Sequence, residues 1–248
     1  MSLDVLGYLN PYEFTCELPG SKETVKFKPF TTGMMKKMLV YEDSTDPFVI
    51  EEMLDEIITS CVLDVDFDID DLYLQDRFYL LMRIREKSKG DVYQYNFRCS
   101  GCKKDNVGSV KLSETKINPI NEVFETIALS EQLSVKMKYL TRGEQKEIFD
   151  LVKGTKLTLE QQMIEATTMS VAQSMDEFTA EGVTSNEVLF KDKMEIINNR
   201  LDVQTFEKLK NCLSAHDFGM DFKIETKCAN KKCGKTEVHR IPLDHFFD

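Results

Sequence analysis

Apolar and polar residues alternate at the start of the chain and then change to a helical period. Residues 14–18 and 25–30 alternate on either side of Pro19-Gly20, which predicts a β-hairpin closed by a tight turn. From about Thr32 onward, methionines recur at helical spacing. The pattern therefore predicts a hairpin followed directly by a helix.

A second helix is predicted to begin at Pro47. Asp46 suits the N-cap, and Pro47 suits the first helical position, where its missing N–H costs nothing. Apolar residues then recur at helical spacing as far as Cys61, so we expect this cysteine to fill core. The acidic residues 64–71 are expected to form a loop that opens a third helix, which ends at Gly90.

Two further hairpins are predicted around closely spaced cysteines. The alternating residues 93–97 run directly into Cys99, and the alternating residues 220–227 run directly into Cys228. After each cysteine pair the chain resumes as a second predicted strand, at residues 107–112 and 237–243. Each cysteine pair is therefore expected at the turn of a hairpin.

The second half of the chain repeats the plan of the first. Residues 24–39 align with residues 134–149 without a gap, and six of the sixteen positions are identical. Helices are predicted from Thr158, which forms a capping box with Gln161, and over two later segments. Those segments are residues 188–197 and 203–213.

Each half then has the order hairpin, helices, strand and cysteine pair, which we interpret as an internal duplication. The expected fold is α+β, with two related lobes of a β-hairpin plus helices joined by a split zinc ribbon. The lobes are residues 1–113, with the first cysteine pair, and residues 122–248, with the second. Residues 113–121 are the predicted linker, and the lobes are expected to form one cooperative unit.

Composition narrows the classes of function. The 248 residues include 32 basic and 43 acidic side chains, a formal net charge of −11. This balance argues against duplex nucleic acid or an anionic membrane surface as the main partner, because both attract basic proteins. Apolar runs fall far short of the roughly 20 residues of a membrane helix. Residues 1–23 do not resemble a signal peptide, so a cytoplasmic protein is expected.

Seven cysteines in a reducing compartment need an explanation other than disulfides. Four form two tight pairs, whereas Cys16, Cys61 and Cys212 stand alone and are expected to fill core. Pairs of this kind on tight turns are the usual halves of a tetrahedral zinc site. The predicted ligands are Cys99, Cys102, Cys228 and Cys233, with the two pairs separated by 125 residues.

Other interpretations of the cysteines remain. A redox C-x-x-C pair needs a strand-to-helix setting, whereas this one lies between strands; the four thiols could also be unrelated. The second spacing, with four intervening residues, leaves the role of Cys233 less secure. Four thiolates would fill a tetrahedron, so the site is expected to be structural, with no open position for water. His239 or His245 could be a ligand only if one cysteine were not.

No catalytic motif accompanies the cysteines, so we expect a protein that is not an enzyme. The sequence lacks the phosphate-binding glycine loops, the G-x-S-x-G nucleophile elbow and the H-E-x-x-H zinc motif. The acidic residues 64–71 lack the glycine and the closing glutamate of a calcium loop. His216 is expected near a helix cap. Phe246 and Phe247 either fold back on the ribbon or dock onto another protein.

The assembled features resemble those of the baseplate hub assembly proteins of T4-like tailed bacteriophages. The resemblance spans nearly the whole chain and depends on the order of its features. They are the hairpin Glu17-Leu-Pro-Gly-Ser21 with Val25-Lys-Phe-Lys-Pro-Phe30, the helix end at Cys61, Asp76-Arg-Phe-Tyr-Leu-Leu-Met-Arg-Ile-Arg85 with Ser88-Lys-Gly90, both cysteine pairs, and Asp244-His-Phe-Phe247.

The resemblance implies a protein that promotes assembly of the baseplate hub in the host cytoplasm through contacts with other hub or tape-measure proteins. Association with the virion is compatible with it. The alternative is a zinc-ribbon nucleic-acid-binding or transcription adaptor, favoured only by the lysines around the cysteine pairs. A metal-dependent hydrolase is a third interpretation and would need an open coordination position.

Overall fold

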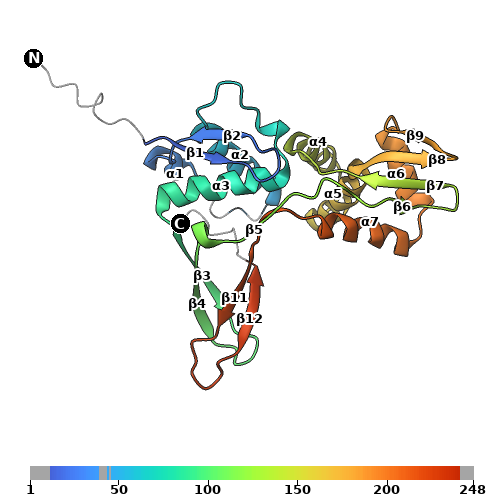
Figure 1. Ribbon diagram of the computed structural model, residues 1–248. Coiled ribbons are helices and arrows are strands. Elements are labelled where there is room, and N and C mark those ends of the chain that lie inside the picture. Colours follow the sequence, from blue (N-terminus) through green and yellow to red (C-terminus); the bar gives the residue numbers. More distant parts are fainter. Residues whose placement is uncertain (1–11, 39–43, 45, 241–248) are drawn as a thin grey trace, which may run out of the picture. The chain divides into compact units, whose positions relative to one another are not determined.

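The computed structural model describes residues 12–38, 44 and 46–240 and combines helices with small antiparallel sheets (Figure 1). The α+β class predicted from the sequence is confirmed. The chain divides into two compact units. The first contains the described residues of Met1–Phe67, Phe78–Asn118 and Gly219–Asp248, and the second contains Asp68–Arg77 and Pro119–Phe218.

The first unit begins with the predicted hairpin and helices. Strands β1 (Phe14–Glu17) and β2 (Thr24–Phe27) pair antiparallel, and α1 (Thr32–Met38) and α2 (Pro47–Cys61) follow, with α3 (Leu74–Lys89) belonging to this unit from Phe78 onward. Asp46 caps α2 by accepting a hydrogen bond of 2.9 Å from the N–H of Phe48, as predicted. Cys61 is fully buried, which confirms its place in the core. The core of this unit includes Phe27, Phe48, Leu54, Ile57, Ile58, Leu80, Leu81 and Ile84.

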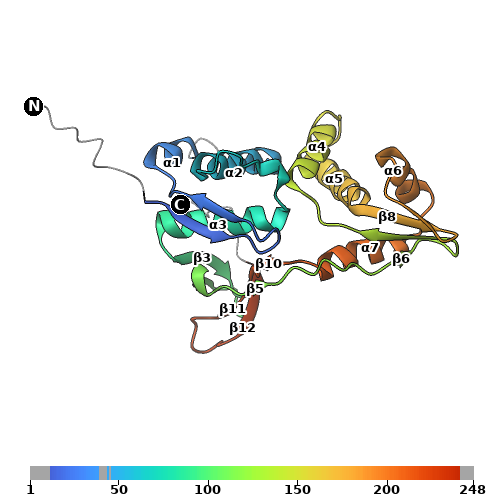
Figure 2. The same ribbon diagram turned by 45° about the horizontal axis from the view of Figure 1, so that its top comes forward.

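Two hairpins complete the first unit and lie side by side (Figures 1 and 2). Strands β3 (Val92–Arg98) and β4 (Asp105–Lys111) form one hairpin, and β11 (Lys223–Lys227) and β12 (Thr236–Arg240) form the other. The two hairpins contact each other through aromatic and polar side chains. The Tyr95 hydroxyl lies 2.5 Å from the Thr226 hydroxyl, and the Phe97 and His239 rings lie 4.5 Å apart.

A short strand pair brings the chain back to the first unit after the second. Beyond a 3-10 turn (Leu112–Glu114), β5 (Ile117–Asn118) pairs antiparallel with β10 (Gly219–Met220), and Asn118 is opposite Gly219. The chain therefore leaves the first unit after Asn118 and returns to it at Gly219, and these two residues are paired. Gly219 has a φ of +81°, a conformation that favours glycine.

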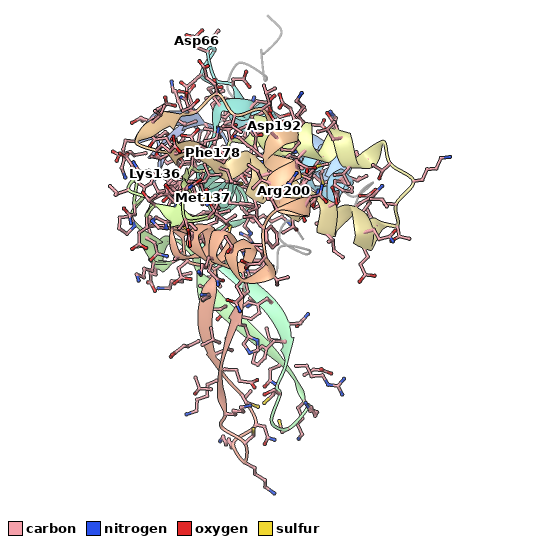
Figure 3. The ribbon with its side chains drawn as sticks, turned by 90° about the vertical axis from the view of Figure 1, so that its right-hand side faces the viewer. Asp66, Lys136, Met137, Phe178, Asp192 and Arg200 are labelled. Carbon is pink, nitrogen blue, oxygen red and sulfur yellow. The ribbon has the colours of Figure 1, made fainter. Side chains whose placement is uncertain are left out.

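The second unit is built on a four-stranded sheet in the order β6-β7-β8-β9. These strands are β6 (Ile127–Ala128), β7 (Leu133–Met137), β8 (Met175–Ala180) and β9 (Val183–Ser185). The helices are α4 (Arg142–Lys153), α5 (Leu159–Ser174), α6 (Phe190–Asn199) and α7 (Val203–Ala215), with a 3-10 turn at Ile69–Asp71. Its core contains Phe124, Val135, Met137, Val171, Ala172, Met175, Phe178, Ile197 and Leu209. Figure 3 labels Met137 and Phe178 on the adjacent strands β7 and β8.

The structure differs from the sequence-based expectations in three places. The hairpin of β8 and β9 was not expected, because its six- and three-residue strands follow a helix without a turn signal. The second cysteine pair belongs to the same compact unit as the first, whereas the predicted lobe 122–248 joined it to the second unit. Cys16 and Cys212 are half-buried and only partly fill core.

The duplication remains a prediction, with one supporting correspondence. The aligned residues 24–39 and 134–149 each contain a strand followed by a helix, as β2 with α1 and as β7 with α4. Thr158 and Gln161 form the predicted capping box at the start of α5. Within the described ranges, no helix combines the length and the apolar character that crossing a membrane requires. Phe246, Phe247 and His245 lie outside the described residues.

Gly108 is expected to be required for the packing of the β3–β4 hairpin. It lies opposite Tyr95, whose ring covers it so closely that an added Cβ would overlap ring atoms. Gly108→Ala should lower the free energy of unfolding by about 1–3 kcal/mol, because the ring must leave its place between the hairpins. Urea denaturation measures the change. Ser109→Ala, at the adjacent exposed position, is the matched control, and equal stability of both variants would contradict the prediction.

Candidate metal centre

The four predicted ligands come together at the ends of the two adjacent hairpins. Cys99 and Cys102 lie in the turn between β3 and β4, and Cys228 and Cys233 lie in the turn between β11 and β12. Their sulfur atoms all lie within 4.8 Å of one another, and Figure 3 shows yellow sulfur atoms at these hairpin ends. In the described part of the chain, this is the group of cysteine, histidine and acidic residues that could hold a metal ion.

The sulfur separations fit a tetrahedral ion. The Sγ atoms of Cys99 and Cys233 are 3.8 Å apart, and those of Cys102 and Cys228 are 3.6 Å apart. A tetrahedral zinc ion with Zn–S bonds of about 2.3 Å requires sulfur–sulfur distances of about 3.8 Å. Each of these close pairs joins one turn to the other, so the site is shared between the hairpins.

Matching backbone turns hold the two cysteine pairs. In the first, the N–H of Cys99 donates to the carbonyl of Lys104 at 3.0 Å, and in the second the N–H of Cys228 donates to the carbonyl of Lys235 at 2.9 Å. The residue after the second cysteine is left-handed in both turns, with φ of 57° at Lys103 and 58° at Gly234. The wider second spacing therefore ends in the same turn as the first, and the sulfur of Cys233 lies in the cluster with the other three.

A glycine allows the two turns to approach. A Cβ added to Gly101 would lie 3.1 Å from Cδ of Lys235 and 3.3 Å from the sulfur of Cys233. Both neighbours belong to the opposite turn. A side chain at position 101 would therefore require the Lys235 side chain and the sulfur of Cys233 to give way by a few tenths of an ångström.

Backbone hydrogen bonds and burial act in opposite directions on the thiols. The N–H of Lys104 lowers the pKa of the Cys102 thiol to about 6. The N–H of Asn230 lowers the pKa of Cys228, but burial and the thiols of Cys102 and Cys99 outweigh it and raise that pKa to about 11. One sulfur ionises readily at the expense of its neighbours, so a bound cation would be needed to keep all four as thiolates.

Asn106 links the two turns and was not identified from the sequence. Its buried side chain donates from Nδ2 to the carbonyl of Lys104 at 2.8 Å. Its Oδ1 accepts from the N–H of Ala229, beside Cys228, at 2.9 Å. An asparagine seven residues after the start of a cysteine turn carries no recognisable signal, because its partner lies 123 residues away.

Glu237 makes a second link between the turns. Its carboxylate accepts from the N–H of Ser100 at 2.9 Å and from the Ser100 hydroxyl, and it pairs with Lys235 at 3.0 Å. Ser100, through its hydroxyl and then its N–H, and Lys235 lower the pKa of Glu237 to about 2. The carboxylate is therefore charged at neutral pH and holds the first turn against strand β12.

His216, His239 and the acidic residues 64–71 are not part of the sulfur cluster. The ring of His239 packs on Phe97, and it is not part of the sulfur cluster. His216 is the C-cap residue of α7, as predicted. Asp68 caps a short 3-10 turn, so part of the acidic run is helical and not loop.

These features define an α+β protein with a four-cysteine site at the ends of two hairpins. A family model for the T4 bacteriophage base plate protein matches residues 10–248, nearly the whole chain. The chain therefore belongs to that family and is a T4-like baseplate protein. Comparison with curated proteins and with solved structures found no match.

Asn106→Ala is expected to weaken metal binding without removing a ligand. Loss of the hydrogen bonds that the Asn106 side chain makes should lower the affinity for zinc by about 10–100-fold, the usual effect of removing a residue that positions metal ligands. Competition with a chromophoric chelator measures this affinity. Asn96→Ala, at an exposed position on β3, should bind as the wild type does; equal losses in both variants would contradict a specific role for Asn106.

Proposed function

We propose that this protein is a non-enzymatic assembly factor or scaffold for the hub of the phage baseplate, and that a structural zinc ion stabilises it. The family match over residues 10–248 is the observation that carries the baseplate role. The finer assignment to hub assembly rests on the sequence resemblance. Hub or tape-measure proteins of the same phage are the proposed partners, and assembly in the host cytoplasm is the proposed setting.

The donor set supports zinc as the ion. Four sulfur ligands at tetrahedral spacing suit zinc, whereas magnesium and calcium prefer oxygen. Cys99, Cys102, Cys228 and Cys233 would supply all four bonds. Zinc would fasten two hairpins whose cysteine pairs are separated by 125 residues, and each hairpin is too small to be stable alone.

The same donor set supports a structural role for the ion. Four thiolates complete the tetrahedron and leave no position at which water or substrate could bind. The side chains beside the cluster also hold the turns together: Asn106 and Glu237 both bridge them. We therefore propose that the protein acts through contacts with other proteins.

A nucleic-acid adaptor is the second candidate, and one observation favours it. The hairpin ends carry exposed basic side chains, which could contact phosphates. They are Arg98, Lys103, Lys104, Lys227, Lys231, Lys232 and Lys235. The net charge of −11 opposes this role. Anisotropy titration with duplex DNA distinguishes the adaptor from the assembly factor, because tight binding that weakens steeply with salt would favour the adaptor.

Purified protein is expected to contain about one zinc ion per chain. Cys99→Ser and Cys228→Ser should each lower both zinc content and thermal stability, because metal binding is coupled to folding of the ribbon. Elemental analysis and thermal denaturation measure these quantities. Cys212→Ser, outside the cluster, should retain zinc. Full zinc retention in both ligand variants would overturn the shared site.

Deletion of the gene from the phage genome tests the assembly role. Without the protein, we expect tails that lack complete baseplate hubs in electron micrographs of infected-cell lysates, and restoration by the wild-type chain supplied from a plasmid. Normal hubs in the deletion phage would contradict the proposal. Mass spectrometry of purified virions then separates an assembly factor, absent from particles, from a retained component.

A further inference from the structure

The second unit contains a groove of about 750 Å³ beside its sheet. One wall is the end of β7 with the residues that follow it, including Met137 and Tyr139, and the other is the segment 120–124. Thr141, Glu144 and Asp176 lie at the same groove. Its volume is within the range of about 300–1,000 Å³ that is usual for binding sites.

The sheet edge along this groove lacks a neighbouring strand. Strand β6 pairs with β7 only at Ser134 and Val135. On the opposite side, the N–H of Lys138 donates to the carbonyl of Ser174 at 2.7 Å. The pairing of β7 with β8 has an irregularity between Lys136 and Met137, beyond which Met137 is opposite Met175. Because backbone groups alternate in direction along a strand and the N–H of Lys138 is directed to the β8 side, we infer that the N–H and C=O of Met137 point away from β8, toward the groove. No strand within the described ranges pairs with β7 on that side beyond Val135.

The wall opposite β7 is held in place by its own contacts. The Phe124 ring stacks on the His216 ring with centroids 4.3 Å apart, and Nε2 of His216 lies 3.1 Å from the carbonyl of Val123. The Tyr139 hydroxyl donates to the carbonyl of Asn121 at 2.7 Å. These contacts fix the segment at a distance from β7, so the groove is formed before anything binds.

Acidic side chains exceed basic ones in the groove. Its four carboxylates are Glu122, Glu144, Asp176 and Glu177, and its two lysines are Lys136 and Lys138. Lys136 pairs with Glu177 at 3.1 Å, and Lys138 pairs with Glu144.

Glu122 and Asp176 form no ion pair within 4 Å in the part of the chain that the structure describes. The buried Lys193 of α6 lies close enough to interact with Asp176, which leaves Glu122 as the less compensated carboxylate.

We propose that this groove binds an extended segment of a partner protein, which adds a strand to β7 at Met137 and directs a lysine or arginine toward Glu122 and Asp176. Addition of a strand to an open sheet edge is a general mode of peptide recognition. The excess of carboxylates favours a basic side chain. The rings of Phe124 and Tyr139 could pack against the aliphatic part of that side chain. The proposal deepens the proposed assembly role, on which it rests, by specifying one kind of partner segment.

Selection from a library of random eight-residue peptides displayed on phage tests the proposal, with the full-length protein as target. The enriched peptides should carry lysine or arginine among β-branched residues, and fluorescence anisotropy should show binding of a synthetic copy. Glu122→Lys with Asp176→Asn should weaken this binding by about tenfold or more, through lost attraction and added repulsion. Glu187→Lys, at an exposed position of the same unit, is the matched control and should bind as the wild type does.

The position of the bound peptide is read from the amide resonances of labelled protein. Binding should shift the Met137 amide and slow its hydrogen exchange, and a peptide with proline at alternate positions should not bind, because it lacks the N–H groups of a strand. Three results would overturn the proposal: no enrichment, equal weakening by Glu187→Lys, or binding that leaves the Met137 amide unchanged. None of these results bears on zinc content or on hub formation in the deletion phage, so failure of the groove is distinguishable from failure of the proposed function.

Discussion

The two cysteine-bearing hairpins of the first unit are joined where four sulfur atoms meet around one point. Cys99 and Cys102 come from one hairpin and Cys228 and Cys233 from another, and each hairpin is a sheet of two strands. The contacts beside the cluster also hold the two turns together, because Asn106 and Glu237 each join one turn to the other. A metal ion at the sulfurs would therefore stabilise the packing of Tyr95 and Phe97 between the hairpins as well.

The two cysteine pairs can form one site although 125 residues separate them, because the chain returns to the first unit beside the point at which it leaves. The pairing of β5 with β10 sets Asn118 opposite Gly219, so the residues between them begin and end at neighbouring positions. The intervening residues build a separate core around Val135, Met175 and Leu209. The four-cysteine cluster and the proposed peptide groove consequently belong to different compact units, and each can be altered without removing residues of the other.

Local signals in the sequence predicted local structure well. Asp46-Pro47 marks the start of α2, and Thr158 with Gln161 marks the start of α5, because caps depend on atoms within a few residues. The four cysteines were also identifiable, since their spacing alone is typical of metal-binding turns. The β8–β9 hairpin was missed because β8 is defined by its pairing with the distant strand β7, which no local pattern encodes, and β9 is defined by its pairing with β8.

The sequence by itself determined the α+β class, the starts of α2 and α5 and the four cysteines whose sulfur atoms meet, all of which follow from short-range spacing. Only the tertiary structure showed that both cysteine pairs belong to one compact unit and that Asn106 and Glu237 position them. It also revealed the open edge at Met137 and its acidic groove. These features depend on residues far apart in the chain, and which distant residues meet is decided by burial and pairing across the whole fold.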